Sequence, residues 1–217
     1  MQVPDTCNCW HSRGTKRREC QQLQVSGTWV LLLVLLAAGC RTVPVAAPVD
    51  WQAEKRARQE LSAWSLSGRA AVATEGDGWS AGIRWLQEGT ASELNLSGAL
   101  GIGGVRVRSD GEAFTVDTSK GEHIEAADAS AALEQAIGVP LPVTHLRYWL
   151  LGVPAPNSPS SEEQGDNGHL ARLEQDGWVI TYDRYVPRGE RTLPARVVME
   201  RAPVRVRVVV DQWDVLR

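Results

Sequence analysis

The sequence lacks an excess of positive charge, and it has only one phenylalanine. Among its 217 residues, 23 are Lys or Arg and 26 are Asp or Glu, which gives a net charge of −3. This balance gives no electrostatic basis for a nucleic-acid partner, because such binding depends on clustered cations. Nine tryptophans stand against the single phenylalanine, so a few large, stiff rings must fill whatever interior the chain forms.

Motifs for catalysis, phosphate binding and metal binding are also missing. His123, His145 and His169 are far apart in the sequence and lack the spacing of metal ligands. There is no GxSxG nucleophile motif, and the glycines of residues 97–104 precede a predicted strand, whereas a phosphate-binding loop opens a helix. We therefore expect no enzymatic activity, no cofactor and no metal, with His145 a packed or surface residue rather than a base.

The N-terminal region has an apolar run that is too short to cross a bilayer. The run, WVLLLVLLAA, covers residues 29–38, whereas a spanning helix needs about 20 residues. A basic cluster, Lys16 to Arg18, precedes it, and small residues end it. This order is typical of a secretory signal, so residues 1–39 are predicted to be a signal peptide of the lipoprotein type.

The end of this run, LLAAGC, resembles the bacterial lipobox, in which signal peptidase cuts before a cysteine that then carries the lipid. That cysteine is Cys40, and Ala37 departs from the more usual leucine three residues before it. The alternative is an ordinary signal peptide with an incidental cysteine. Under the enterobacterial sorting rule Arg41 favours the outer membrane, so the resemblance implies a lipid-anchored protein that faces the periplasm of a Gram-negative bacterium.

Cysteine usage agrees with this processing. Cys7, Cys9 and Cys20 lie before the predicted cut and would be removed with the leader. The processed chain keeps only Cys40, so it has no intramolecular disulfide even in an oxidising compartment. Residues 40–49 contain the lipidated cysteine and a stretch rich in proline and alanine, which is predicted to be a flexible tether.

The periodicity of the remaining chain changes from helical to extended. Asp50 is a predicted N-cap for a helix over residues 51–63, where Trp51, Arg58 and Leu61 share a face. Short segments with apolar residues at every second position follow, separated by turn signals, which is typical of an antiparallel meander. The predicted strands are 66–74, 78–87, 93–97, 105–109, 112–118, 169–175, 178–183, 195–201 and 204–213.

Two further helices interrupt the strands. The first covers residues 128–138 and ends at Gly138, and the second covers 144–152 with Thr144 as its cap. Residues 157–168 are predicted to be a loop, in which Glu162 and Glu163 are solvated. The pattern predicts a mainly β (α+β) fold, with a rolled sheet and helices over its concave face.

Seven segments of the chain, in order, are similar to the family of the outer-membrane lipoprotein receptor LolB. The similarity covers Asp50 to Val215, and residues 50–217 are predicted to form one domain. Its most specific parts are the block LPVTHLRYWLLGVPAP and the closing strand with Trp213. It implies an incomplete, unclosed antiparallel β-barrel of roughly eleven strands with a lid of about three helices. It also implies a monomer that accepts lipoproteins from the periplasmic carrier LolA and inserts them into the inner leaflet of the outer membrane.

The stretch SGALGIGG, residues 97–104, places bulky apolar side chains in a glycine-rich turn. In the family, a protruding loop carries an exposed leucine, and here Leu100 takes that position, with Ala99 replacing a proline. The resemblance therefore implies that Leu100, Gly101 and Ile102 form a loop that inserts into outer-membrane lipid. The alternative is that Leu100 folds back into the core.

A tryptophan-rich apolar interior suggests a cavity for the acyl chains of lipoproteins. Each candidate lining residue has the alternative of ordinary filled core. Two other functions remain open, a lipid-binding lipoprotein of other purpose and an outer-membrane assembly scaffold, whereas a hydrolase lacks a nucleophile with a partner. The predicted lining residues are Trp79, Ile83, Trp85, Leu94, Leu96, Trp149 and Trp178.

Overall fold

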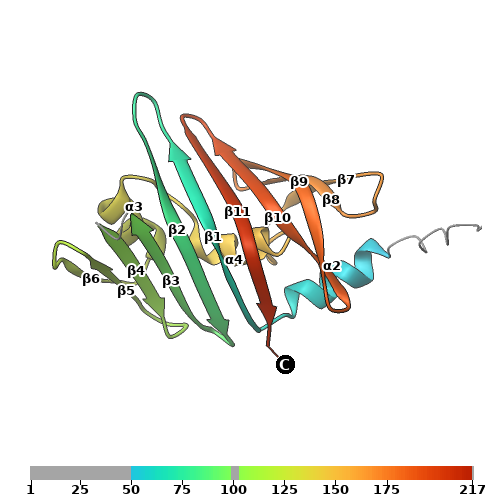
Figure 1. The fold of residues 1–217 in the computed structure, drawn as a ribbon, viewed down its shortest axis with the longest axis horizontal. Helices are drawn as coiled ribbons and strands as arrows, with labels where there is room; N and C mark the ends of the chain where they lie inside the picture. The colour runs from blue at the N-terminus through green and yellow to red at the C-terminus, as the bar shows by residue number, and fades with distance from the viewer. Residues whose placement is uncertain (1–49, 99–102, 217) are drawn as a thin grey trace, which may run out of the picture. The chain divides into compact units, whose positions relative to one another are not determined.

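The computed structural model describes residues 50–98 and 103–216, which form one antiparallel sheet and three helices (Figure 1). The eleven strands confirm the predicted fold class. Their bounds are β1 Ala63–Ala73, β2 Gly78–Glu88, β3 Ala91–Gly98, β4 Gly104–Ser109, β5 Phe114–Thr118, β6 His123–Ala126, β7 Ser160–Gln164, β8 Leu170–Gln175, β9 Trp178–Arg188, β10 Arg191–Arg201 and β11 Val204–Val215.

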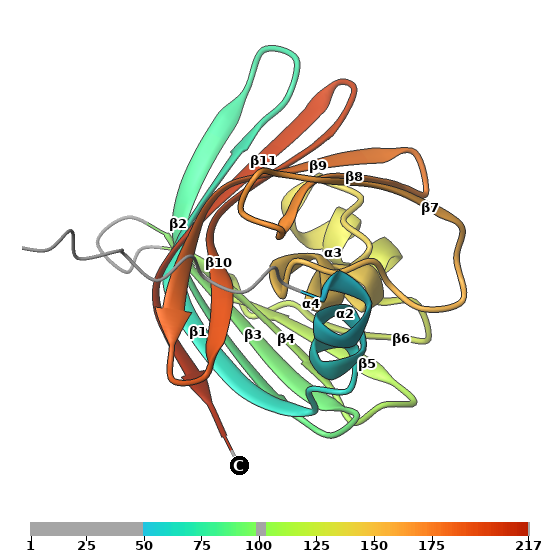
Figure 2. The same cartoon turned by 90° about the vertical axis from the view of Figure 1, so that its right-hand side faces the viewer.

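The sheet is open, because its two edge strands do not pair. The strand order is β6-β5-β4-β3-β2-β1-β11-β10-β9-β8-β7. The first and last strands, β1 and β11, therefore pair in the middle of the sheet, with Leu66 opposite Trp213. Figure 2 shows the sheet curving around the helices, so its concave face is the one that they cover.

The alternation of side chains decides which face is buried. In β2, Ala81, Ile83 and Trp85 are buried, whereas Arg84 and Leu86 between and beyond them are exposed. Successive side chains of a strand point to opposite faces of a sheet. The apolar side of each long strand therefore faces the helices, and the arginine-rich side faces solvent.

The helices lie inside the curve of the sheet (Figure 2). Helix α3, Ala129–Ile137, begins after Asp128, whose side chain accepts a hydrogen bond from Ser130 N, and ends at Gly138 with φ of 75°, as predicted. Helix α4, Val143–Leu150, has Pro142 rather than Thr144 as its N-cap, so the predicted cap is wrong. Proline provides the fixed φ of a helix start but no side-chain acceptor.

The third helix, α2, spans Trp51–Gln59 and is shorter than predicted. Asp50 caps it as expected, with its carboxylate accepting from the backbone N–H of Gln52 and Ala53. The predicted end at residue 63 is wrong because Ala63 already pairs with Glu88 as the first residue of β1. Because β1 pairs with β2 from Ala63 onward, these residues are extended although their apolar spacing is helical.

Neither edge strand, β6 or β7, was predicted from the sequence. The predicted loop over residues 157–168 contains β7, and no strand was predicted at β6. The segment SSEEQ of β7 is polar throughout, so it shows no alternation of apolar side chains. Its backbone pairing with β8, from Ser160 opposite Gln175 onward, forms the strand instead.

Candidate functional site

A group of three tryptophans fills the centre of the concave face. Trp64 of β1 stacks on Trp85 of β2 with ring centroids 5.7 Å apart, and it lies 5.5 Å from the ring of Trp213. The Trp213 indole donates a hydrogen bond of 2.7 Å to the carbonyl of Pro194. Because all three rings are buried, this part of the concave face is filled by the protein's own side chains.

A second aromatic pair fixes α4 to the other half of the sheet. The rings of Trp149 and Trp178 are 6.1 Å apart, and the Trp149 indole donates to Gln175 Oε1 at 2.8 Å. Gln175 also accepts from the N–H of Ala155 and donates to the carbonyls of Ala155 and Ser158. This buried amide therefore joins α4, β8 and the segment after α4 through satisfied hydrogen bonds.

An apolar pocket of about 300 Å³ opens on the concave side between α3 and the strands β2 to β4. Ile137, at the end of α3, lies on one side of it, and Trp79, Leu96 and Val105 come from the three strands. All four side chains are apolar, and Trp79, Val105 and Ile137 are only partly buried. The complete lining is Trp79, Ser80, Ala81, Leu96, Gly98, Gly103, Gly104, Val105 and Ile137.

The predicted cavity residues fall in three places. Trp79 and Leu96 line the apolar pocket, and Trp85 lines a second pocket of about 240 Å³. The others are buried side chains of the core, at Ile83, Leu94, Trp149 and Trp178. Of these, Ile83 and Trp178 also border other pockets, of about 550 Å³ and 410 Å³. Contact of any of them with an acyl chain stays a prediction.

The predicted lipid attachment site and membrane loop lie outside the described residues. These are Cys40 and the three loop residues Leu100, Gly101 and Ile102. Strand β3 ends at Gly98 and β4 begins at Gly104, and the N–H of Gly98 donates to the carbonyl of Gly103 at 2.8 Å. Since Gly98 and Gly103 both line the apolar pocket, the chain enters and leaves the predicted loop at the rim of that pocket.

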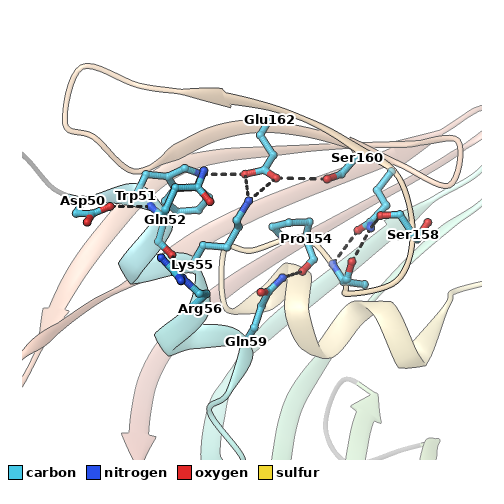
Figure 3. A network of polar contacts seen from close by, with 12 residues as sticks. Asp50, Trp51, Gln52, Lys55, Arg56, Gln59, Pro154, Ser158, Ser160 and Glu162 are labelled. Atoms are coloured by element: carbon cyan, nitrogen blue, oxygen red, sulfur yellow. Dashed lines mark hydrogen bonds and ion pairs between the residues drawn. The ribbon is translucent and has the colours of Figure 1, made fainter.

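Helix α2 is held by polar contacts to the edge strand β7 and to the segment after α4 (Figure 3). Glu162 accepts a hydrogen bond of 2.8 Å from the Trp51 indole and forms an ion pair of 3.0 Å with Lys55. Gln59 Nε2 donates to the carbonyl of Pro154 at 2.9 Å. Glu162 is therefore a partly buried acceptor between two elements, and the predicted solvation of its carboxylate is wrong.

The sequence did not predict that Arg58 connects elements of this region. Its guanidinium is fully buried and forms an ion pair of 2.8 Å with Glu54. It also donates to the carbonyls of Leu151, at 3.1 Å, and Thr192, at 2.7 Å. The one sequence feature that indicated burial of Arg58 was its position on the same helical face as Trp51, which is also buried. Arg58 thereby joins α2 to the end of α4 and to β10.

The titratable groups beside Arg58 are shifted toward their uncharged forms. Burial raises the pKa of Tyr182 and of Tyr185, whose hydroxyls donate to the carbonyls of Trp149 and Leu170. Burial, and next the Arg58 guanidinium, lowers the pKa of His169, whose ring stacks on Tyr185 at 4.8 Å. The cluster therefore holds α2 in place with neutral aromatic groups around one buried cation.

Residues 50–98 and 103–216 contain no group of three or more His, Cys, Asp or Glu arranged to hold a metal ion. Within the same ranges, no helix has the length and apolar character needed to span a bilayer.

Comparison with known proteins identifies relatives over most of the chain. A family model described as "Outer membrane lipoprotein LolB" matches residues 62–213. The chain is 36% identical over 191 residues to the outer-membrane lipoprotein LolB of Nitrosococcus oceani, which covers 85% of this chain and 95% of that protein. It is 32% identical over 192 residues to LolB of Ectopseudomonas mendocina, with 85% and 94% covered.

Solved structures share the fold at low identity. A LolA superfamily protein from Nitrosomonas europaea has a TM-score of 0.53 at 12% identity, with 78% of this chain and 94% of that chain covered. A putative outer membrane lipoprotein-sorting protein domain from Vibrio parahaemolyticus has a TM-score of 0.51 at 7% identity, with 75% and 89% covered. The fold agrees with these structures, and the sequence matches decide the family: the chain belongs to the outer-membrane lipoprotein LolB family.

Proposed function

We propose that this protein accepts lipoproteins from a LolA-like periplasmic carrier and inserts them into the inner leaflet of the outer membrane. The observation that carries the proposal is the apolar pocket between α3 and β2 to β4, which Trp79, Leu96 and Ile137 line. The family membership and the predicted lipidation of Cys40 support it. The protein would then act as a lipid-anchored monomer that binds acyl chains without performing a reaction.

The size of the pocket implies that α3 moves when cargo enters. A volume of about 300 Å³ holds on the order of ten groups the size of a water molecule, which is less than one long acyl chain. Ala132 and Leu133 of α3 are buried against the sheet, and Ala136 and Ile137 are partly buried. Displacement of this apolar face by acyl chains exchanges one set of apolar contacts for another, so the exchange carries a small net cost.

Energetics favour direct transfer between apolar surfaces. Each methylene moved from water into an apolar environment is worth about 0.8 kcal/mol, so escape of an acyl chain through water is very costly. Without an energy source in the receptor, cargo moves from the carrier to the receptor and on to the bilayer only if each site binds it more strongly than the one before. The lining of the pocket by Gly98 and Gly103 supports an exit for cargo at this end of the pocket.

The deciding experiment follows a radiolabelled lipoprotein from LolA to the receptor and then to outer-membrane vesicles. Leu100→Glu is expected to leave acceptance from LolA intact and to impair delivery, because a charged side chain opposes insertion of the loop into the leaflet. Leu86→Glu is the matched control, since Leu86 is an exposed leucine on the outward side of β2. A receptor that accepts no cargo would overturn the proposed function, and equal loss of both steps in Leu100→Glu would place Leu100 in the core.

A further inference from the structure

A second pocket lies at the other end of the same strands and has a different chemistry. Its volume is about 240 Å³, and it lies between the first two turns of α4 and the ends of β2 to β5. The β2–β3 and β4–β5 turns that border it lie at the same end of the sheet (Figure 1). Its lining is Trp85, Gln87, Thr90, Ser92, Ser109, Gly111, Phe114, Val143, Thr144, Arg147 and Tyr148.

The sheet side of this pocket combines aromatic rings with hydroxyl groups. Trp85 and Phe114 contribute apolar surface, and Ser92 and Ser109 take the inward positions that apolar residues hold elsewhere on these strands. The Trp85 indole donates to Gln87 Oε1, and Gln87 Nε2 donates to two carbonyls of the β2–β3 turn. These internal bonds fix the floor of the pocket while the serine hydroxyls remain in its lining.

Among the described residues, Arg147 is the one side chain of the lining that carries a charge at neutral pH. Its guanidinium carbon lies 4.9 Å from the centre of the Tyr148 ring, and its Nε is buried with no hydrogen-bond partner in the described part of the chain. A buried donor without a partner is costly, and a guanidinium suits carboxylate and phosphate groups. The Arg147 guanidinium therefore gives the pocket a group suited to an anionic ligand.

The described lining of the pocket contains no carboxylate that would neutralise Arg147. The nearby turn contains Asp110, but its carboxylate accepts the backbone N–H groups of Glu112 and Ala113, each at 2.9 Å, and it does not line the pocket. Those two bonds lower the pKa of Asp110. Val143 and Thr144 at the start of α4 also line the pocket, and no side chain caps this helix. The positive end of the helix therefore adds to the charge of Arg147.

We propose that this pocket binds the anionic group of a small amphiphile, a phosphodiester or a carboxylate, with Arg147 as its charged partner. The apolar part of the ligand packs against Trp85, Phe114 and Tyr148. This site goes beyond the proposed reception of lipoproteins, because it recognises charge and lies apart from the apolar pocket under α3. It gives the protein a binding site for an anionic lipid or a fatty acid besides its cargo.

Calorimetric titration of the full chain tests the proposal with three soluble probes. Dihexanoyl phosphatidylglycerol carries a phosphodiester, octanoate carries a carboxylate, and octyl glucoside has a neutral headgroup. We expect at least one anionic probe to bind and the neutral probe to bind about tenfold more weakly or not at all. Tighter binding of the phosphodiester identifies a membrane phospholipid as the source, and tighter binding of the carboxylate identifies a free fatty acid.

Two variants assign the binding to this pocket. Arg147→Gln is expected to lower the affinity for the anionic probe about tenfold or more. Arg84→Gln changes an exposed arginine on the outward side of β2 and should leave this affinity unchanged. Thr144→Glu places a negative charge at the exposed rim, where an acidic residue in the first helical turn does not destabilise the fold. The Thr144→Glu variant should have a lower affinity for the anionic probe and an unchanged affinity for octyl glucoside.

Three results would overturn this assignment. The first is equal affinity for the neutral and anionic probes, and the second is no binding of any probe. The third is that Thr144→Glu and a folded Arg147→Gln variant both bind the anionic probe with unchanged affinity. None of these results depends on LolA or on lipoprotein transfer, so failure of this proposal and failure of the proposed function are distinguishable.

Discussion

Arg58 is a charged residue with no exposed surface, and its partners account for its position. The guanidinium bonds the carbonyls of Leu151 and Thr192 and pairs with Glu54. A buried cation of this kind joins elements that have few apolar contacts with one another, which suits a helix as polar as α2. Removal of the guanidinium would leave two carbonyls and a partly buried carboxylate without their partner.

We expect Arg58→Met to lower the free energy of unfolding by about 3 kcal/mol. The lost hydrogen bonds and ion pair outweigh the apolar contacts that methionine provides. Urea denaturation followed by tryptophan fluorescence measures the change. Arg56→Met is the control, because Arg56 is exposed on the same helix, and similar midpoints for the two variants would show that Arg58 contributes no more than a surface arginine.

At the scale of single elements, the edge hairpin β5–β6 carries a charge network around His123. Its Nδ1 lies 2.7 Å from Asp117 Oδ1, its Nε2 lies 3.5 Å from Glu125, and Arg108 pairs with the other Asp117 oxygen at 3.1 Å. The hydrogen bond that the His123 ring donates to Asp117, and next the one it donates to Glu125, raises the pKa of His123. The protonated ring therefore contributes stability below its ordinary pKa of about 6.5, and this contribution is lost as pH rises through the higher native pKa.

Asp117→Asn is expected to lower the pKa of His123 toward its ordinary value, because the largest cause of the shift is removed. The measurement is a pH titration of the His123 ring resonances in two-dimensional proton–carbon NMR spectra, which gives the pKa. Glu125→Gln, which removes the weaker contact, should lower it less. An unchanged pKa in Asp117→Asn would show that the hydrogen bond does not form in solution.

The long strands were predictable from sequence, and the edge strands were not. In β2 the alternation of Trp79, Ala81, Ile83 and Trp85 with polar residues indicates both the strand and its buried face. In β7 no such alternation exists, because its side chains meet solvent and α2 rather than the core. Edge strands depend on backbone pairing with one neighbour, and that pairing leaves little trace in the side chains.

The candidate site was predictable only in part for a similar reason. Trp79 and Leu96 were expected in a cavity and do line the apolar pocket, whereas Arg58 and Arg147 gave no signal beyond their helical positions. Apolar alternation shows which face of a strand is covered. It does not show where the covering helix leaves space, since that depends on the packing of α3 and α4 against the sheet.

At the scale of the whole molecule, filling the apolar pocket should stop reception of cargo. Ala81 is buried and lines this pocket, and its neighbour across the strand pair is Ala70 of β1. Ala81→Phe places a ring in the space that an acyl chain would occupy, so we expect lipoprotein transfer from LolA to fall at least about tenfold. The transfer assay with radiolabelled lipoprotein measures it.

Ala71→Phe is the matched control for this prediction, because Ala71 is exposed on the opposite face of the adjacent strand. It adds the same ring without entering the pocket, and transfer should stay at the level of the unchanged protein. Thermal melting of both variants checks that they fold. Normal transfer by a folded Ala81→Phe variant would mean that cargo enters the protein elsewhere.

The pairing of β1 with β11 also has a consequence for biosynthesis. Strand β1 is synthesised first of the eleven and pairs with β2 and β11. Because β11 is synthesised last, β1 has only β2 as a neighbour until then. The two parts of the sheet, β1 to β6 and β7 to β10, therefore pair with each other only after Val204–Val215 has been synthesised. A nonsense codon ahead of those twelve residues would therefore leave the two parts of the sheet without the strand that pairs with both, rather than a slightly shortened sheet.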